Sequence, residues 1–185
     1  MDPDSQHSGW GLIRPNEGIE FCGLVWHVLV RNGPAKKLTE VVSDIDGIIL
    51  SCMEICKTKG WRLVVVCENQ FSAKNWKSSF MIVEIRRTWE TLAARHGLQT
   101  DKMMPLNWRS FVFPGQNRRT TKKRIWKRLA KELVLNELLE NKKHMTNEEK
   151  EKFERSLFSD TAEGCCIGKA WMRYNRGCKV QRKLC

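Results

Sequence analysis

Residues 62–68 read R-L-V-V-V-C-E, a short run rich in valine. Valine favours strands, and an uninterrupted apolar run of this length predicts a strand in the interior of a sheet. The preceding residues 35–57 carry apolar side chains at spacings of three and four, which predicts an amphipathic helix that ends before Gly60. A buried strand next to an amphipathic helix indicates a fold of mixed class.

Further segments extend this pattern in both directions. Residues 19–31, 79–85 and 108–113 are rich in apolar, β-branched or aromatic residues and are predicted as strands. Residues 86–95 are predicted as a second helix that ends before a glycine. The order strand, helix, strand, strand, helix, strand is that of a split α+β sandwich, so the predicted fold class is α+β.

Composition divides the chain into three parts. Residues 1–18 hold Pro, Gly, Ser and Asp with little periodicity, which predicts a flexible N-terminal arm. Residues 19–115 form the predicted α+β core, and residues 116–185 a basic, helical, cysteine-containing C-terminal module. No apolar run approaches the roughly 18 to 20 residues that a membrane-spanning helix needs, so no membrane partner is expected.

The net charge of +12 is unevenly distributed. Residues 1–115 carry 14 Lys and Arg against 12 Asp and Glu, whereas residues 116–185 carry 19 against 9. A concentrated positive charge attracts polyanions, so nucleic acid is the first partner class to consider. A solvated basic surface without a partner is the alternative.

The basic segment at residues 117–131 is the strongest single signal, with eight basic residues and no acidic one. On a helix, its cations fall on one side and apolar side chains such as Trp126 on the other, so Trp126 is expected in the core. Cations spaced in this way match phosphates, and the cluster also fits a nuclear-import signal. The predicted binding or import residues are Arg118, Arg119, Lys122, Lys123, Arg124, Lys127, Arg128 and Lys131.

Eight cysteines are expected to be thiols or metal ligands rather than disulfides, because the chain has no secretory signal pattern. Zinc needs four ligands in tetrahedral geometry. The candidate zinc ligands are His144, Cys165, Cys166 and Cys178. The two adjacent cysteines cannot easily bind one ion together, and this tract has no C-x-x-C pair, so the main expectation is that no cofactor is bound.

Catalytic motifs are incomplete in this sequence. Viral origin-nicking endonucleases present two histidines flanking one hydrophobe on a strand, but here Val25 stands two positions before His27. The single tyrosine, Tyr174, lies in the cysteine-rich tail. There is no Gly-rich phosphate loop, nucleophile elbow or H-E-x-x-H pattern. The sequence therefore predicts a protein that is not an enzyme, with a degenerate or active nicking endonuclease as an alternative.

Two stretches resemble the small accessory nonstructural nucleoprotein of parvoviruses, which is known from bocaparvoviruses and from avian and chaphamaparvovirus groups. They are F-C-G-L-V-W-H-V-L-V-R-N-G at 21–33 and N-E-L-L-E-N-K-K-H-M-T-N-E-E-K-E-K-F at 136–153, followed by G-C-C-I-G-K-A-W-M-R-Y-N-R at 164–176. The family's Arg/Ser-rich N-terminal tail is missing, and Gly168 replaces its second cysteine. The residues that carry the resemblance are Cys22, Gly23, Trp26, His27, Leu138, Leu139 and Trp171.

This resemblance implies a protein of the host nucleus that regulates splicing and polyadenylation of viral pre-mRNA and supports viral DNA replication. The implied partners are RNA or viral DNA, host RNA-processing factors and a nuclear import receptor. A module that binds host proteins, such as innate-immune components, through apolar helix faces and without nucleic acid is the alternative.

Overall fold

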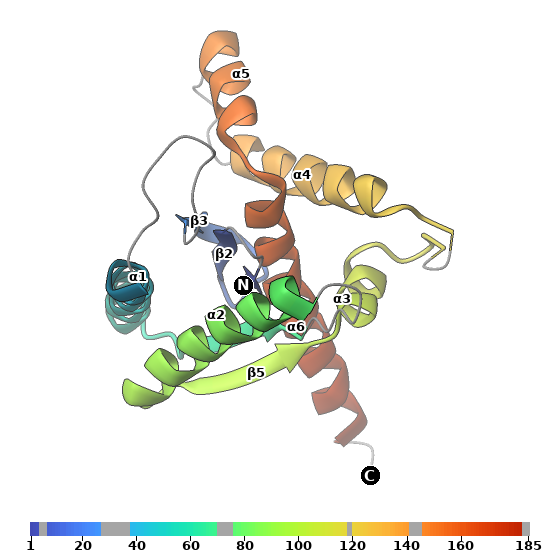
Figure 1. Cartoon of the computed structure of the whole chain (residues 1–185). Coiled ribbons are helices and arrows are strands. Elements are labelled where there is room, and N and C mark those ends of the chain that lie inside the picture. Colours follow the sequence, from blue (N-terminus) through green and yellow to red (C-terminus); the bar gives the residue numbers. More distant parts are fainter. Residues whose placement is uncertain (4–6, 27–37, 70–75, 118–119, 141–145, 183–185) are drawn as a thin grey trace.

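The computed structural model describes residues 1–3, 7–26, 38–69, 76–117, 120–140 and 146–182, which form strands and helices of a mixed fold (Figure 1). The predicted α+β class is confirmed. The strands are β1 (Asp2–Pro3), β2 (His7–Ile13), β3 (Ile19–Trp26), β4 (Val64–Glu68) and β5 (Gln99–Met103). The helices are α1 (Leu38–Thr58), α2 (Trp76–Arg95), α3 (Pro105–Val112), α4 (Lys123–Glu140), α5 (Asn147–Ser156) and α6 (Ser159–Arg182).

The strands form a three-stranded antiparallel sheet, β1-β2-β3, and a parallel pair, β4-β5. Met1 joins the two. Its amino nitrogen donates to the carbonyl oxygen of Val66 over 2.5 Å, and the amide of Glu68 donates to the carbonyl oxygen of Met1 over 2.9 Å. These two bonds follow the pattern of a parallel pair, so the backbone of Asp2 continues alongside Glu68.

The apolar side chains gather in two clusters on opposite faces of β4. Val66 packs with residues of α3, α4 and α6, whereas Cys67 packs with residues of α1 and α2. Successive side chains of a strand point to opposite faces, so Glu68 points to the same side as Val66. The last residue of β4 therefore faces α6.

Glycines allow α6 to pack closely across β2. A β-carbon on Gly9 would lie 1.8 Å from the carbonyl oxygen of Asp160, and one on Gly164 would lie 2.6 Å from the carbonyl oxygen of Gly9. Neither position can take a side chain unless helix and strand move apart. This contact determines where the first turns of α6 lie relative to the strands.

The expectation of a flexible arm over residues 1–18 is wrong for the part that the structure describes. β1 and β2 lie there, Leu12 is buried, and β2 packs against α6. Gly9 and Gly11 suggest a loop in the sequence, but in the structure they allow α6 to pack closely against β2. A cluster containing Ile19, Trp108 and Ala162 also crosses the predicted boundary between residues 115 and 116.

Two predicted strands are helical. Residues 79–85 belong to α2, because Ile85, Trp89 and Leu92 recur at helical spacing and are buried against α1 and β4. Residues 108–113 lie mostly in α3, which starts with a proline and buries Trp108 and Val112 four residues apart. Short apolar runs fit both structures, and only the wider context separates them.

The remaining elements agree with the sequence more closely. The predicted helix at 35–57 corresponds to α1, the strand at 62–68 to β4, and the basic helix to α4. β3 covers the first part of the strand predicted at 19–31, and residues 27–31 lie outside the described residues. Within the described part, no helix is long and apolar enough to span a membrane.

Candidate functional site

Three buried carboxylates lie near one another between the end of β4 and the start of α6. Glu68, Asp160 and Glu163 expose 1%, 5% and 3% of their surface, and we call them the acidic cluster. The charges of Glu68 and Asp160 both act to raise the pKa of Glu163, which places both of these carboxyl groups within electrostatic reach of Glu163. Burying carboxylates costs free energy unless they are paired, so a group of three is a candidate functional site.

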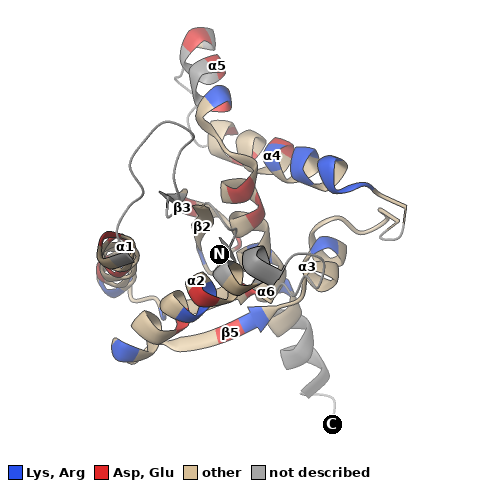
Figure 2. Ribbon diagram, in the orientation of Figure 1, with Lys and Arg blue, Asp and Glu red and all other residues tan. Residues whose placement is uncertain are grey.

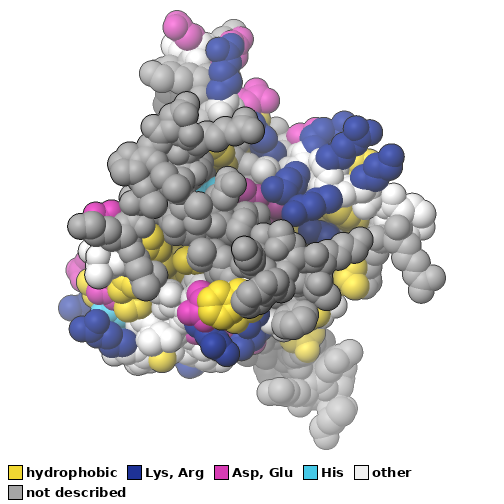
Figure 3. Space-filling model, viewed as in Figure 1, with side chains coloured by type: hydrophobic (Ala, Val, Ile, Leu, Met, Phe, Trp, Pro, Cys, Tyr) yellow, Lys and Arg dark blue, Asp and Glu magenta, His cyan; other side chains and the backbone are white. Residues whose placement is uncertain are grey.

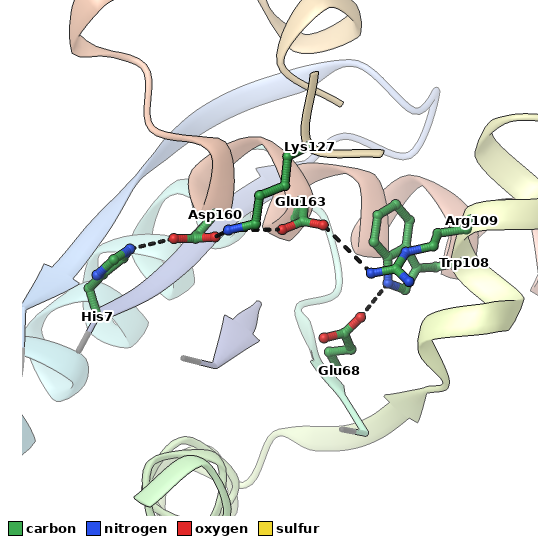
Figure 4. A network of polar contacts seen from close by, with 7 residues as sticks. All are labelled: His7, Glu68, Trp108, Arg109, Lys127, Asp160 and Glu163. Carbon is green, nitrogen blue, oxygen red and sulfur yellow. Dashed lines mark hydrogen bonds and ion pairs between the residues drawn. The ribbon is translucent and has the colours of Figure 1, made fainter. Parts of the chain in front are cut away.

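The three carboxylates come from two elements of the fold, the end of β4 and the start of α6. Glu68 ends β4 and points toward α6, where the indole Nε1 of Trp108 donates a hydrogen bond to its Oε1 over 2.5 Å. Asp160 and Glu163 are three residues apart on α6 and therefore share one face of that helix. Figure 4 shows Asp160 and Glu163 side by side along α6 with Lys127 between them, and Glu68 below them with its carboxylate directed to Trp108.

Basic side chains from α3 and α4 and a histidine from β2 contact the cluster (Figure 4). The Nζ atom of Lys127 lies 2.5 Å from Oδ1 of Asp160 and 3.8 Å from Oε2 of Glu163. A guanidinium nitrogen of Arg109 lies 3.8 Å from Oε1 of Glu163. Nε2 of His7 hydrogen-bonds to Oδ2 of Asp160.

These contacts give two of the carboxyl groups opposite ionisation behaviour. At Asp160, burial acts to raise the pKa, but the hydrogen bonds from His7 and Lys127 outweigh it and lower the pKa to about 2. At Glu163, burial and the charges of Glu68 and Asp160 outweigh Lys127 and Arg109 and raise the pKa to about 7. The cluster thus combines a carboxylate that stays ionised with one that binds a proton near neutral pH.

The donor set of the cluster fits a divalent cation. Carboxylate oxygens are the ligands that Mg²⁺ prefers, and Oε1 of Glu163 is buried without a hydrogen-bond donor. In the arrangement of the described residues, no three His, Cys, Asp or Glu side chains surround one ion position. In Figure 4, Lys127 lies between Asp160 and Glu163, and Arg109 lies beside Glu163.

The basic residues predicted from the sequence divide into two groups. Four of them lie exposed at the start of α4 or just before it, namely Lys122, Lys123, Arg124 and Arg128. Figures 2 and 3 show this basic surface. Lys127 instead turns toward the acidic cluster, and Lys131 is half-buried one turn later. Trp126 is buried as expected, and Arg118 and Arg119 lie outside the described residues.

The described part of the chain gives no support for zinc at the predicted cysteines. Cys165 and Cys166 are fully buried in α6. A hydrogen bond with Cys22 and burial raise the pKa of Cys165 well above its usual value, and burial raises that of Cys166 to about 12. Protonated thiols are poor metal ligands. His144 lies outside the described residues, as does the side chain of Cys178.

Of the residues that carry the parvovirus resemblance, Cys22, Leu138 and Trp171 pack against one apolar cluster. Cys22 and Gly23 are on β3, where the carbonyl oxygen of Gly23 accepts a hydrogen bond from Thr161 over 3.1 Å. Nε1 of Trp171 donates to Asp101 over 2.7 Å. Leu138 and Leu139 are half-buried on α4, the side chain of Trp26 is outside the described part, and so is His27. The described contacts hold the fold together.

Sequence reasoning missed the acidic cluster because its members come from distant parts of the chain. Two local signals could have indicated it. Glu68 directly follows four apolar residues of a buried strand, and Asp160 and Glu163 stand at the start of a helix whose next residues are Gly, Cys, Cys and Ile. Asp and Glu are rarely buried, so a carboxylate that directly adjoins an apolar, buried run indicates a special role.

Comparisons with known proteins were informative for the fold. No protein-family model matches the chain, and no curated protein matches it. A solved structure of T. thermophilus RuvC in complex with Holliday junction substrate is similar, with a TM-score of 0.60 and 16% identity over 95% of this chain and 91% of that one. A second Thermus thermophilus RuvC structure has a TM-score of 0.59 and 15% identity over 95% and 92% of the two chains.

These structures correct the expectation that the chain is not an enzyme. RuvC is described with a Holliday junction as its substrate, and the present chain has the same fold over most of its length. The catalytic motifs considered from the sequence are short contiguous patterns. In the acidic cluster, Glu68 is far from Asp160 and Glu163 in the sequence, and the three come together only on folding. The chain has the fold of RuvC.

Proposed function

We propose that this protein is a nuclease that binds and cleaves branched DNA at the acidic cluster with the help of a divalent cation. The observation that carries the proposal is the convergence of Glu68, Asp160 and Glu163 where β4 ends and α6 begins. The similarity in fold to RuvC, which was solved with a Holliday junction, supports a branched DNA as the substrate class.

Cleavage of a phosphodiester requires an activated water and stabilisation of the charge that develops on the phosphate. A divalent cation held by Glu68, Asp160 and Glu163 would supply both. The surrounding residues hold these ligands in position: Trp108 binds Glu68, and His7 binds Asp160. Such contacts matter because a displacement of about 1 Å in an active site can cost roughly 10²-fold in rate.

The basic surface at the start of α4 gives the protein a means of binding the DNA backbone. Lys127 on this helix contacts the cluster, and the exposed Lys123 lies one turn before it. Phosphates bound by Lys123, Arg124 and Arg128 would therefore lie close to the carboxylates. Binding of this kind follows the backbone rather than the base sequence.

The test is cleavage of an end-labelled four-way DNA junction in Mg²⁺ and in Mn²⁺, with a linear duplex of the same sequence for comparison. The wild-type protein is expected to cut the junction, and Asp160→Asn to bind it without cutting. Glu151→Gln is the matched control, because Glu151 is exposed on α5, where it pairs with Arg155, and should leave cleavage unchanged. Cleavage by Asp160→Asn at the wild-type rate, or no cleavage by the wild type in either metal, would refute the proposal.

A further inference from the structure

Lys127 differs from the other basic residues of α4 in where its charge lies. Lys123, one turn before it, and Arg128, directly after it, are exposed, whereas the side chain of Lys127 is 28% exposed and reaches into the acidic cluster. Its Nζ atom contacts Asp160 at 2.5 Å and Glu163 at 3.8 Å. In Figure 4 the ammonium group lies between these two carboxylates.

The surroundings show that a positive charge is needed at this position. Asp160 and Glu163 are almost fully buried, and removing one partner of a buried ion pair leaves an uncompensated charge. Without Lys127, His7 would remain in contact with Asp160, and Arg109 lies 3.8 Å from Glu163. The ammonium therefore stabilises the cluster when no other cation is present.

The same position cannot hold two cations at once. Oδ1 of Asp160 accepts a hydrogen bond from Lys127, and Oε2 of Glu163 lies 3.8 Å from the same ammonium. An ion bound between the two carboxylates would repel the ammonium and take over its contacts. Lysine has a flexible stem of four carbons, so Nζ can move out toward solvent without a change in the backbone.

The geometry points to Lys127 as an internal competitor of the divalent cation. It occupies the cation position between Asp160 and Glu163 when the metal is absent, and leaves it when the metal binds. This inference rests on the proposed function, since it assumes that the acidic cluster binds a metal. Once displaced, Lys127 joins the exposed cations of α4, so metal binding adds one positive charge to the surface that we propose holds DNA.

The first experiment measures Mn²⁺ binding directly, by the loss of the free Mn²⁺ signal in electron paramagnetic resonance. Removing a competitor increases the apparent affinity, so Lys127→Met is expected to bind Mn²⁺ about tenfold or more tightly than the wild type. Lys127→Arg keeps the charge and should bind as weakly as the wild type. Lys131→Met, one turn along α4, is the matched control and should not differ from the wild type.

Lys127→Gln provides a second neutral variant in case Lys127→Met does not fold, because an amide can still donate to Asp160. Circular dichroism shows which variants are folded. If the wild type binds Mn²⁺ and neither neutral variant binds it more tightly, the competitor role is refuted while the proposed nuclease stands. If no folded variant binds Mn²⁺, with or without a DNA junction, the acidic cluster is not a metal site and both proposals fail.

The second experiment separates displacement from a general effect of charge. Lysine amines of the wild type are modified with a reagent that reacts with amines, with and without saturating Mn²⁺, and the extent at each site is read by mass spectrometry. Modification of Lys127 is expected to rise several-fold when Mn²⁺ is bound, because its ammonium is released from the carboxylates. Modification of Lys131 should stay constant. Equal modification of Lys127 in both conditions would overturn the inference.

Discussion

Replacing Gly164 with alanine is expected to destabilise the protein and to disable the proposed active site together. The new β-carbon would lie 2.6 Å from the carbonyl oxygen of Gly9, where close carbon to oxygen contacts are about 3.3 to 3.6 Å. Helix α6 would therefore have to move away from β2 by roughly 0.7 to 1 Å. Asp160 and Glu163 are on that part of α6 and would move with it.

The expected losses of stability and of cleavage rate follow from these distances. Overpacking of this kind costs about 1 to 3 kcal/mol in the free energy of unfolding. For a chain of this size, each kcal/mol lowers Tm by about 2 to 4 °C. A shift of nearly 1 Å in the carboxylates relative to Glu68, which belongs to β4, should lower the rate of junction cleavage by about 10²-fold.

Chemical unfolding and junction cleavage are measured on the same preparations, with Gly47→Ala as the matched control. Gly47 lies in the middle of α1, and a β-carbon there would meet nothing within 4 Å. That substitution should raise the free energy of unfolding by about 0.5 to 1 kcal/mol, because alanine favours helices. Gly164→Ala with wild-type stability and wild-type cleavage would show that the close contact between α6 and β2 does not position the site.

Three other predictions address single contacts. Trp108→Phe removes the indole donor to Glu68 and should lower the free energy of unfolding in urea by about 1 to 3 kcal/mol, whereas no loss would mean that this bond is unimportant. The double variant Lys123→Glu/Arg124→Glu should weaken DNA binding and reduce the slope of log K against log salt by roughly 1.8, read by fluorescence anisotropy; an unchanged slope would exclude phosphate contacts there. Burial raises the pKa of Cys52 from 9.0 to about 11, so the unfolded thiol loses its proton at a lower pH than the folded one. Stability should therefore fall as pH rises from 9 to 11, and fall less in Cys52→Ser; equal losses would contradict this account.

Local patterns in the sequence predict several elements of this fold but not its topology. The helical spacing in residues 35–57 and the valines of residues 62–68 are strong local signals, and α1 and β4 lie there. The stretch at 79–85 has no such bias, and its helix is decided by packing against α1 and β4. The glycines of β2 suggest a loop by local propensity, yet they are required by contact with a helix about 150 residues later, as the 153-residue separation of His7 and Asp160 illustrates.

The candidate site is less predictable than the fold. The sequence predicts the helix α4 and places Lys123, Lys127 and Lys131 on one side of it, but no local pattern distinguishes Lys127, which turns to Asp160, from Lys123 and Arg128, which are exposed. That difference depends on Asp160, which reaches α4 only through the packing of α6. The resemblance to the parvovirus nucleoprotein, the nuclear location and the role in RNA processing remain predictions from sequence alone.

Stability alone does not explain why the fold contains an acidic cluster. Buried ion pairs often contribute less to folding than apolar side chains of similar volume would, because removing charges from water is costly. Here the core cluster around α6 is apolar and includes Trp108, Val134 and Ile167, so apolar residues at positions 160 and 163 would match its character. Instead the chain holds three carboxylates there, with Lys127 and Arg109 to compensate their charge. An arrangement that costs stability and depends on residues from four elements points to a role for its carboxylates beyond folding, and the cation binding that we propose would be such a role.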